Sequence, residues 1–339
     1  MDDHPTLTTH GFLKDRTVLV TGAGGFIGSQ LVEALLEAGA HVRAFARYNS
    51  RGDPGLLHLL PQEMTSRFDL IPGDLRDLQA IQAAMKGCEF VFHLGALISI
   101  PYSYLHPAEV AQTNFIGTLN VLLACRELGV RRLIHTSTSE VYGTALHVPM
   151  DEDHPLQGQS PYSASKIGAD KLAESFYCAY GLPVTTVRPF NTFGPRQSAR
   201  AVIPTVITQA LTMNTIHLGN LDARRDFTYV DDTVNGFVQA VQAEGAAGKT
   251  FNLGTGREIS IGELARLVIQ KVSRPVEIVV DPERLRPEKS EVQRLLSDNS
   301  LAKEVLGWQP RVPFEQGLER TIAWVRSHLE LYRPGRYEF

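Results

Sequence analysis

The sequence predicts an α/β protein built on a doubly wound parallel sheet, followed by a smaller C-terminal α/β lobe. Short apolar runs alternate with helical patterns through the first half of the chain, as in parallel sheets with helices on both faces. After Arg188, prolines and glycines become frequent and the expected elements shorten. The chain has 339 residues, which is long for one compact core and suits two lobes.

Each expected element follows from the spacing of its apolar residues. Strands are expected at 17–21, 41–46, 68–71, 89–94, 132–137 and 184–188, and helices at 26–38, 77–86, 107–128 and 161–180. The run 251–253 is expected to return a strand to the main sheet. The first domain is therefore expected to comprise residues 14–190 and about 226–255, and the second lobe 191–225 and 256–330.

A glycine-rich turn separates the first expected strand from the first expected helix. Glycines let the backbone approach a ligand closely, and a helix N-terminus offers unpaired N–H groups to an anion. Strand, glycine turn and helix in this order are typical of a dinucleotide pyrophosphate site. The first domain is thus expected to be of the Rossmann type and to bind a dinucleotide through Gly22, Gly25, Phe26, Ile27 and Gly28.

A Tyr and a Lys stand four residues apart at the start of the helix expected over 161–180. Ser160 can cap this helix and Pro161 suits its first position, so Tyr162 and Lys166 share one face. A neighbouring ammonium is expected to lower the pKa of the phenol below its ordinary value of about 10. Such a pair can take a proton from a sugar hydroxyl while hydride leaves the same carbon. An ordinary amphipathic helix with an exposed Lys is the alternative.

Composition and charge narrow the class of protein. Hydrophobic residues make up 43% and charged residues 21% of the chain, as in soluble globular proteins, and the net charge of -4 argues against a nucleic-acid partner. The 3 cysteines form no close pair, which indicates reduced thiols in a cytoplasmic protein. The histidines show no metal-ligand spacing, so no metal is expected.

The apolar run 90–100 contains His93 and stops at Pro101. It is too short to span a membrane and is expected to form a buried strand and turn.

Eight motifs in fixed order extend from about Arg16 to Trp324. They are TGAGGFIG (21–28), GDLRD (73–77), FHLGA (92–96), TSTSEVYG (136–143), YSASK (162–166), RPFNTFGPRQ (188–197), RRDFTYVDD (224–232) and RPEKSEV (286–292). Together they resemble the extended short-chain dehydrogenase/reductase family, in the branch of nucleotide-sugar epimerases and dehydratases. The resemblance implies a tightly bound, recycled NAD(P)+ and a nucleotide-diphosphate sugar as substrate. It also implies a homodimer formed through about 107–128 and 161–180.

The resemblance assigns roles to individual residues. Tyr162 would act as base on the 4-hydroxyl, Lys166 would hold the nicotinamide ribose, and Thr138 would bond the reacting oxygen. Further cofactor contacts would come from Arg47, Asp74, Leu75, Leu94 and Ala96. Asp74 could instead be a simple helix cap. Substrate contacts would come from Asn191, Arg196, Arg225 and Arg286, since a guanidinium matches a diphosphate. A solvated surface charge is the alternative for the arginines.

The segment 138–140 discriminates among the reactions of this branch. Glu140 could take the C5 proton and help to expel the 6-hydroxyl as water, as in nucleotide-sugar 4,6-dehydratases, which resemble this chain here. A salt bridge or a helix-start carboxylate is the alternative. The dTDP-glucose dehydratases have an Asp where this chain has Ser139, whereas the GDP-mannose dehydratases also have Ser. A 4-epimerase or a UDP-glucuronate decarboxylase remains an alternative function.

Other sequence segments indicate the class of substrate and the cofactor. The segments 48–50, 100–104, 165–170 and 286–292 most resemble NAD-dependent 4,6-dehydratases of legionaminic-acid pathways, which act on a nucleotide-linked N-acetylglucosamine. The expected substrate is thus a UDP- or GDP-linked hexose, including this sugar. After the second strand comes Arg47, with no acid until Asp53. That pattern favours NADP, whereas the resemblance favours NAD. Both NAD and NADP therefore remain candidates for the cofactor.

Overall fold

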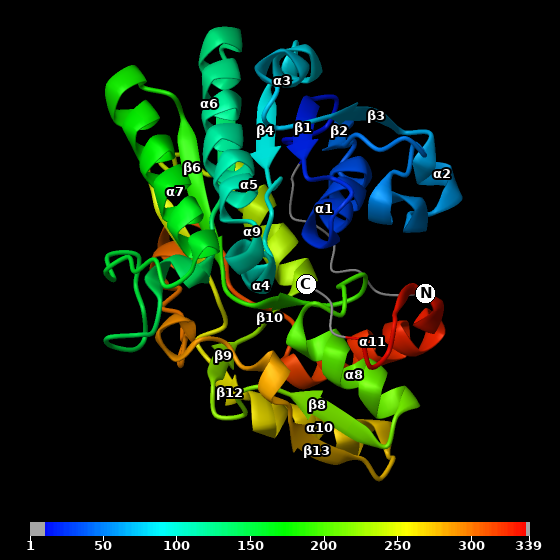
Figure 1. Cartoon of the computed structure of the whole chain (residues 1–339). Helices are drawn as coiled ribbons and strands as arrows, with labels where there is room; N and C mark the ends of the chain where they lie inside the picture. Colours follow the sequence, from blue (N-terminus) through cyan, green and yellow to red (C-terminus); the bar gives the residue numbers. More distant parts are fainter. Residues whose placement is uncertain (1–10, 337–339) are drawn as a thin grey trace.

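The computed structural model describes residues 11–336, and its centre is a parallel sheet flanked by helices (Figure 1). The 7-stranded sheet has the order β11-β6-β5-β4-β1-β2-β3, and every neighbouring pair is parallel. Its strands are β1 (Thr17–Thr21), β2 (His41–Arg47), β3 (Phe68–Gly73), β4 (Phe90–His93), β5 (Arg132–Thr136), β6 (Val184–Pro189) and β11 (Thr250–Leu253). The predicted doubly wound parallel sheet is confirmed, including the returning strand.

Helices cover both faces of this sheet. One face packs against α1 (Phe26–Glu37) and α9 (Val230–Gln242), which also contact each other. The other face is covered by α3 (Leu78–Met85), α6 (Gly117–Leu128) and α7 (Pro161–Tyr180). A separate buried apolar cluster lies on each face, since parallel strands bury both of their sides.

The ends of α7 follow from its local sequence. Ser160 accepts a hydrogen bond from the backbone N–H of Ser163, and the Ser163 side chain accepts one from the backbone N–H of Ser160. Pro161 occupies the first turn, where a missing N–H costs nothing. Gly181 ends the helix with φ 64, a left-handed conformation that glycine adopts readily. The N-terminal cap fixes the start of α7 and therefore the positions of Tyr162 and Lys166 on the helix.

The remaining elements form a smaller lobe below the carboxyl ends of the sheet in Figure 1. It contains two short pairings: β8 with β13 is parallel, and β9 with β12 is antiparallel. Its elements are α8 (Val202–Thr212), β8 (Thr215–Leu218), β9 (Arg224–Asp226), β12 (Glu258–Ser260), α10 (Ile261–Val272), β13 (Glu277–Val280) and α11 (Phe314–Ser327). β7 (Thr192–Phe193) pairs with β10 (Thr228–Tyr229) between this lobe and the sheet.

Two segments differ from the sequence prediction. The expected turn after β4 contains a helix, α4 (Ile100–Leu105), because the Ser99 side chain accepts from the Tyr102 N–H and Pro101 lies in the first turn. The helix expected over 107–128 consists of α5 (Pro107–Ala111), a π turn η2 (Gln112–Ile116) and α6. The π turn carries Asn114, whose side chain bonds the backbone of Leu97 and the Ser165 hydroxyl.

Short helical elements complete the chain. They are η1 (Gly55–Leu59), α2 (Gln62–Thr65), η3 (Ser139–Tyr142), η4 (Pro282–Arg284), η5 (Glu288–Ser290), η6 (Ala302–Leu306) and η7 (Leu329–Leu331). Within residues 11–336 no helix combines the length and apolar character needed to cross a membrane.

Candidate active site

The glycine turn between β1 and α1 forms a cradle that side chains would fill. A Cβ added to Gly28 would lie 2.1 Å from the carbonyl oxygen of Gly22, and one added to Gly22 would lie 2.8 Å from Gly95. Gly25 is the N-cap of α1 and makes no side-chain capping bond, so the first N–H groups of the helix are available to an anion. This part of the chain therefore fits a dinucleotide pyrophosphate.

Replacing Gly28 with alanine is expected to weaken dinucleotide binding and to destabilise the fold by about 1–3 kcal/mol, because the turn must move to admit the methyl group. Calorimetric titration with NAD and thermal unfolding measure the two effects. Gly262→Ala is the matched control: this glycine also lies in the first turn of a helix, and its added Cβ would meet Leu221 at an ordinary 3.4 Å. Equal affinity in both variants would contradict the assignment of the cradle.

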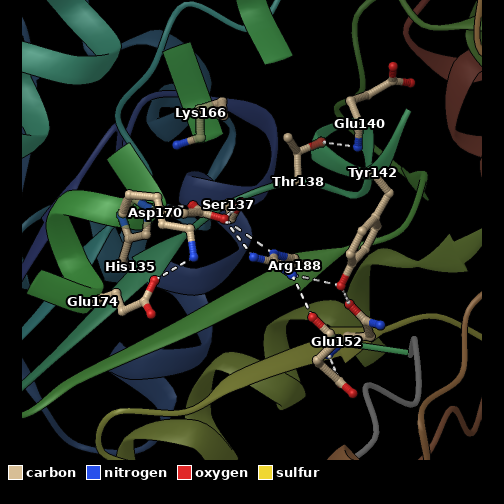
Figure 2. Close-up of polar contacts among 12 residues, drawn as sticks. His135, Ser137, Thr138, Glu140, Tyr142, Glu152, Lys166, Asp170, Glu174 and Arg188 are labelled. Atoms are coloured by element: carbon tan, nitrogen blue, oxygen red, sulfur yellow. Dashed lines mark hydrogen bonds and ion pairs between the residues drawn. The ribbon is translucent and has the colours of Figure 1, made fainter. Parts of the chain in front are cut away.

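Tyr162 and Lys166 lie on the buried side of α7, against the end of β5. Tyr162 is 6% exposed and Lys166 is 3% exposed. The Nζ of Lys166 donates to the carbonyl oxygen of Thr136 at 2.7 Å. Thr138 follows β5, accepts from the N–H of Glu140 at 3.2 Å, and hydrogen-bonds the Tyr162 hydroxyl. The helix and the strand end thus bring Tyr162, Lys166 and Thr138 together, and Figure 2 shows Lys166, Thr138 and Glu140 in one region.

The expected depression of the Tyr162 pKa is not found in this structure. Burial raises the pKa of Tyr162 far above the ordinary value, the Thr138 hydrogen bond lowers it, and the charges of Glu140 and Asp170 raise it. The Lys166 ammonium is directed at a backbone carbonyl, and burial lowers its pKa to about 8. Desolvation is therefore the dominant effect on both members of the pair.

The other residues assigned to the cofactor lie near the carboxyl ends of β1 to β4. Leu75 packs against Gly95, where an added Cβ would lie 2.7 Å from its side chain. The backbone N–H of Leu94 bonds the carbonyl of Thr21, and Ala96 lies between Gly95 and Leu97. The interpretation of Asp74 as a helix cap is wrong, since Asp77 caps α3.

Two charged residues of this region have partners that the sequence did not indicate. The carboxylate of Asp74 binds the guanidinium of Arg76, whose hydrogen bond lowers the pKa of Asp74. Arg47 at the end of β2 is exposed, and its guanidinium is 3.6 Å from Glu109. His93, interpreted as a core residue, is buried between the hydroxyls of Thr21 and Thr118.

A pocket lies between the end of the sheet and the smaller lobe. Three residues assigned to the substrate, Asn191, Arg225 and Arg286, line it together with Glu140. The side-chain Oδ1 of Asn191 and one terminal nitrogen of Arg286 are buried and have no hydrogen-bond partner among residues 11–336. Buried polar groups without partners are costly, so these atoms indicate a polar ligand.

The charges of this pocket favour an anion. Its lining includes four arginines, Arg200, Arg225, Arg284 and Arg286, but only two carboxylates, Glu140 and Glu291. Arg225 is 6% exposed; burial lowers its pKa, and the charge of Glu140 raises it. The Arg225 guanidinium is 3.4 Å from Glu291. Within the described residues the Glu140 carboxylate has no ion-pair partner within 4.0 Å, so the salt-bridge alternative for Glu140 is not formed. The helix-start position is found, because Glu140 lies in the first turn of η3.

Arg196 and Ser139 stand apart from this pocket lining. Arg196 binds Glu33 on α1 at 2.6 Å, which joins the segment after β7 to the helix of the glycine cradle. Ser139 is 2% exposed in η3, beside Glu140. The structure therefore groups Glu140, Asn191, Arg225 and Arg286, and places Arg196 against the first domain.

The sequence reasoning missed several polar residues of this region. Arg200 and Glu291 line the pocket from loops and Arg284 from η4; the path of these segments depends on the second lobe, and no local spacing indicates them. Asp170 is different, because it lies four residues after Lys166 and eight after Tyr162. That spacing places it on the same helical face, so periodicity could have indicated it.

Comparison with known proteins agrees with this geometry. The family model of GDP-mannose 4,6 dehydratase matches residues 19–321. A UDP-glucose 4-epimerase of Mycolicibacterium smegmatis is 36% identical, over 91% of this chain and 98% of that protein. A dTDP-glucose 4,6-dehydratase of Streptomyces griseus is 34% identical, over 97% of each.

A solved structure extends the likeness to the whole fold. DesIV, a dTDP-glucose 4,6-dehydratase of Streptomyces venezuelae solved with NAD bound, superposes with a TM-score of 0.85 at 29% identity. The alignment covers 94% of this chain and 99% of that one. The chain therefore belongs to the extended short-chain dehydrogenase/reductase family, in its branch of nucleotide-sugar epimerases and dehydratases.

Proposed function

We propose that this protein is a nucleotide-sugar 4,6-dehydratase that converts a hexose into its 4-keto-6-deoxy form. The observation behind this proposal is the position of Glu140. Its carboxylate lines the pocket with Asn191, Arg225 and Arg286, while its backbone N–H is bonded to Thr138, the hydroxyl that bonds Tyr162. An acid and a phenol are thus close enough to act on adjacent carbons of one sugar.

The glycine cradle and the Tyr162–Lys166 pair support a nicotinamide dinucleotide as cofactor, as in DesIV. A bound oxidised nicotinamide would supply reversible hydride acceptance from C4 and a positive charge that favours the phenolate of Tyr162. Lys166 would hold the ribose hydroxyls and add its own positive charge. Separate titrations with NAD and NADP measure which dinucleotide is preferred.

The chain's own residues move the protons. Tyr162 takes the proton of the 4-hydroxyl as that carbon becomes a ketone, and Thr138 holds the same oxygen. The ketone acidifies the C5 proton, which passes to the Glu140 carboxylate. The protonated Glu140 then gives a proton to the departing 6-hydroxyl, which leaves as water. Finally the proton held by Tyr162 passes, through water, to C5, which leaves Tyr162 and Glu140 in their starting protonation states.

The arginines of the pocket suit a diphosphate. Arg225 and Arg286 present guanidinium groups, which bind phosphate oxygens in pairs, and the Asn191 side chain and Glu140 line the same pocket. We propose that they hold the diphosphate of a UDP- or GDP-linked hexose, such as N-acetylglucosamine. We also propose that two chains pair through α6 and α7.

Incubation with UDP- and GDP-linked N-acetylglucosamine, dTDP-glucose and UDP-glucuronate, followed by mass spectrometry, tests the function. A product lighter by one water molecule is expected. The second candidate is a 4-epimerase, which the likeness to the M. smegmatis enzyme favours and which would give an isomer of unchanged mass. Loss of carbon dioxide would identify a decarboxylase. Either of the last two results would overturn the dehydratase proposal.

A further inference from the structure

A third polar residue occupies the active face of α7. Tyr162, Lys166 and Asp170 are spaced by four residues, so they lie one above the other along the helix. All three are buried, and Asp170 is 5% exposed. Their hydrogen-bond partners all lie at the end of β5 or just after it. Tyr162 bonds Thr138, and Lys166 bonds Thr136. Asp170 bonds Ser137 and His135.

The Asp170 carboxylate is held from two strands (Figure 2). Its Oδ1 is 3.0 Å from the Nε2 of His135. Its Oδ2 accepts from the Ser137 hydroxyl at 2.7 Å and from two nitrogens of Arg188 at 3.1 and 3.2 Å. Arg188 is itself fixed, because it also donates to the hydroxyl of Tyr142 at 2.9 Å. A carboxylate with this many donors keeps its charge although it is buried.

The partners of Lys166 do not supply a negative charge. Its ammonium donates to a neutral backbone carbonyl, and burial favours the neutral amine. The charge that favours the ammonium is that of Asp170, one helical turn away.

The other ionisable groups around Lys166 are neutral, positive or directed elsewhere. His93 of β4, His135 of β5 and Arg188 of β6 carry no negative charge, and each of the two histidines has its pKa lowered by burial. The charge of Glu140, in η3, raises the pKa of Tyr162 and that of Arg225. Glu109 of α5 accepts from the Tyr102 hydroxyl of α4 and lies near Arg47. Helix α6 faces this region with Thr118, which does not titrate.

We propose that Asp170 is the buried counter-charge of Lys166, a positioning residue that keeps the lysine protonated and so sets the upper end of the pH range in which the Tyr162–Lys166 pair works. This inference rests on the proposed function for its effect on turnover, but not for its effect on the charge of Lys166. Asp170 is not among the residues that line the substrate pocket, nor among the atoms nearest to the glycines of the cradle.

The direction of the expected pH effect follows from the sign of the charge. The pKa of Lys166 is already lowered to about 8 by burial, with Asp170 opposing that shift. Removing the carboxylate lowers this pKa further, so Lys166 loses its proton at a lower pH. The alkaline limb of the turnover profile should therefore move toward neutral pH by about 1 unit or more, as expected for loss of a buried opposite charge one helical turn away.

The experiment compares Asp170→Asn with Glu174→Gln. Glu174 is the matched control: it lies one turn further along the same helix, but its side chain is 58% exposed and bonds Lys171. Protein with dinucleotide bound is labelled with ¹³C at lysine Cε, and the Lys166 resonance is assigned by its loss in Lys166→Arg. The titration midpoint should fall by about 1 unit or more in Asp170→Asn and stay unchanged in Glu174→Gln.

The same variants are assayed for turnover across pH. Asp170→Glu, which keeps the charge, should restore the profile of the original protein in part. If Asp170→Asn does not fold because Arg188 is left unpaired, the double variant Asp170→Asn/Arg188→Gln removes both charges. Its midpoint should still fall, but by less than in Asp170→Asn, because loss of the Arg188 charge raises the pKa of Lys166.

An unchanged Lys166 midpoint, with turnover reduced equally at every pH, would overturn the proposal and leave Asp170 a purely structural residue. If the proposed function is wrong, the nucleotide sugar is epimerised, decarboxylated or left unchanged instead of losing water, yet the NMR titration of Lys166 still gives its answer. The two failures are therefore distinguishable.

Discussion

Replacing Tyr162 with phenylalanine is expected to lower turnover by about 10²–10⁴-fold, the usual contribution of a positioned acid–base group. The variant loses only the phenolic oxygen, which Thr138 bonds in the structure. Its ring still fills the buried position, where 6% of the residue is exposed. Dinucleotide affinity and the unfolding temperature should therefore change little. Steady-state assays and calorimetric titration measure these quantities.

Tyr177→Phe provides the control for the chemical change. Tyr177 lies on the same helix, but it is 40% exposed and faces away from the active site, toward Gly248. The control should keep full turnover. If Tyr162→Phe worked within a few-fold of the original protein, the phenol would not be the base, and the mechanism proposed for C4 oxidation would be wrong.

Replacing Glu140 with glutamine is expected to separate C4 oxidation from loss of water. The amide can neither take the C5 proton nor protonate the 6-hydroxyl, so formation of the 4-keto-6-deoxy product should fall by about 10²–10⁴-fold. Tyr162, Lys166 and Thr138 remain, so C4 should still be oxidised. Trapping with borodeuteride and mass spectrometry should reveal deuterium at C4 of a hexose that keeps its 6-hydroxyl.

Glu288→Gln is the control, because this exposed residue of η5 lies near the pocket segment but does not line it. Its product and rate should match those of the original protein. Unchanged product formation by Glu140→Gln would contradict the role of Glu140 in elimination. If the product is an isomer of the same mass in both variants, the enzyme is an epimerase.

Much of the first domain could be predicted because its signals are local. Strand 17–21, the glycine turn and the helix that follows are neighbours in sequence, and their φ angles and caps depend on residues a few positions apart. The same holds for α7, whose capping residues Ser160 and Ser163 adjoin the Tyr–Lys motif. The helix α4 was missed because an apolar run that ends at a proline resembles a turn, although Ser99 caps it.

The pKa values could not be predicted in this way. The spacing of Tyr162 and Lys166 correctly places them on one face, but it contains no information about burial. Burial comes from the elements that pack on α7, namely α4, α5, α6, η2, η3 and β6, and it reverses the expected shift of the Tyr162 pKa. The shift of a pKa therefore cannot be predicted from the charge of a neighbouring side chain alone, because it also depends on how far both groups are buried from solvent.

The sequence by itself determined the parallel sheet, the dinucleotide cradle and the pairing of Tyr162 with Lys166, because each depends on periodicity or on a turn within one short segment. Only the tertiary structure decided which distant side chains share a pocket and which charged side chains stabilise one another. Glu140 lies in η3, Arg225 in β9 and Arg286 in the loop after η4, and Asp170 meets His135 and Arg188 from two strands. Such contacts depend on how the elements pack, because the chain distances between these residues place no limit on which of them touch.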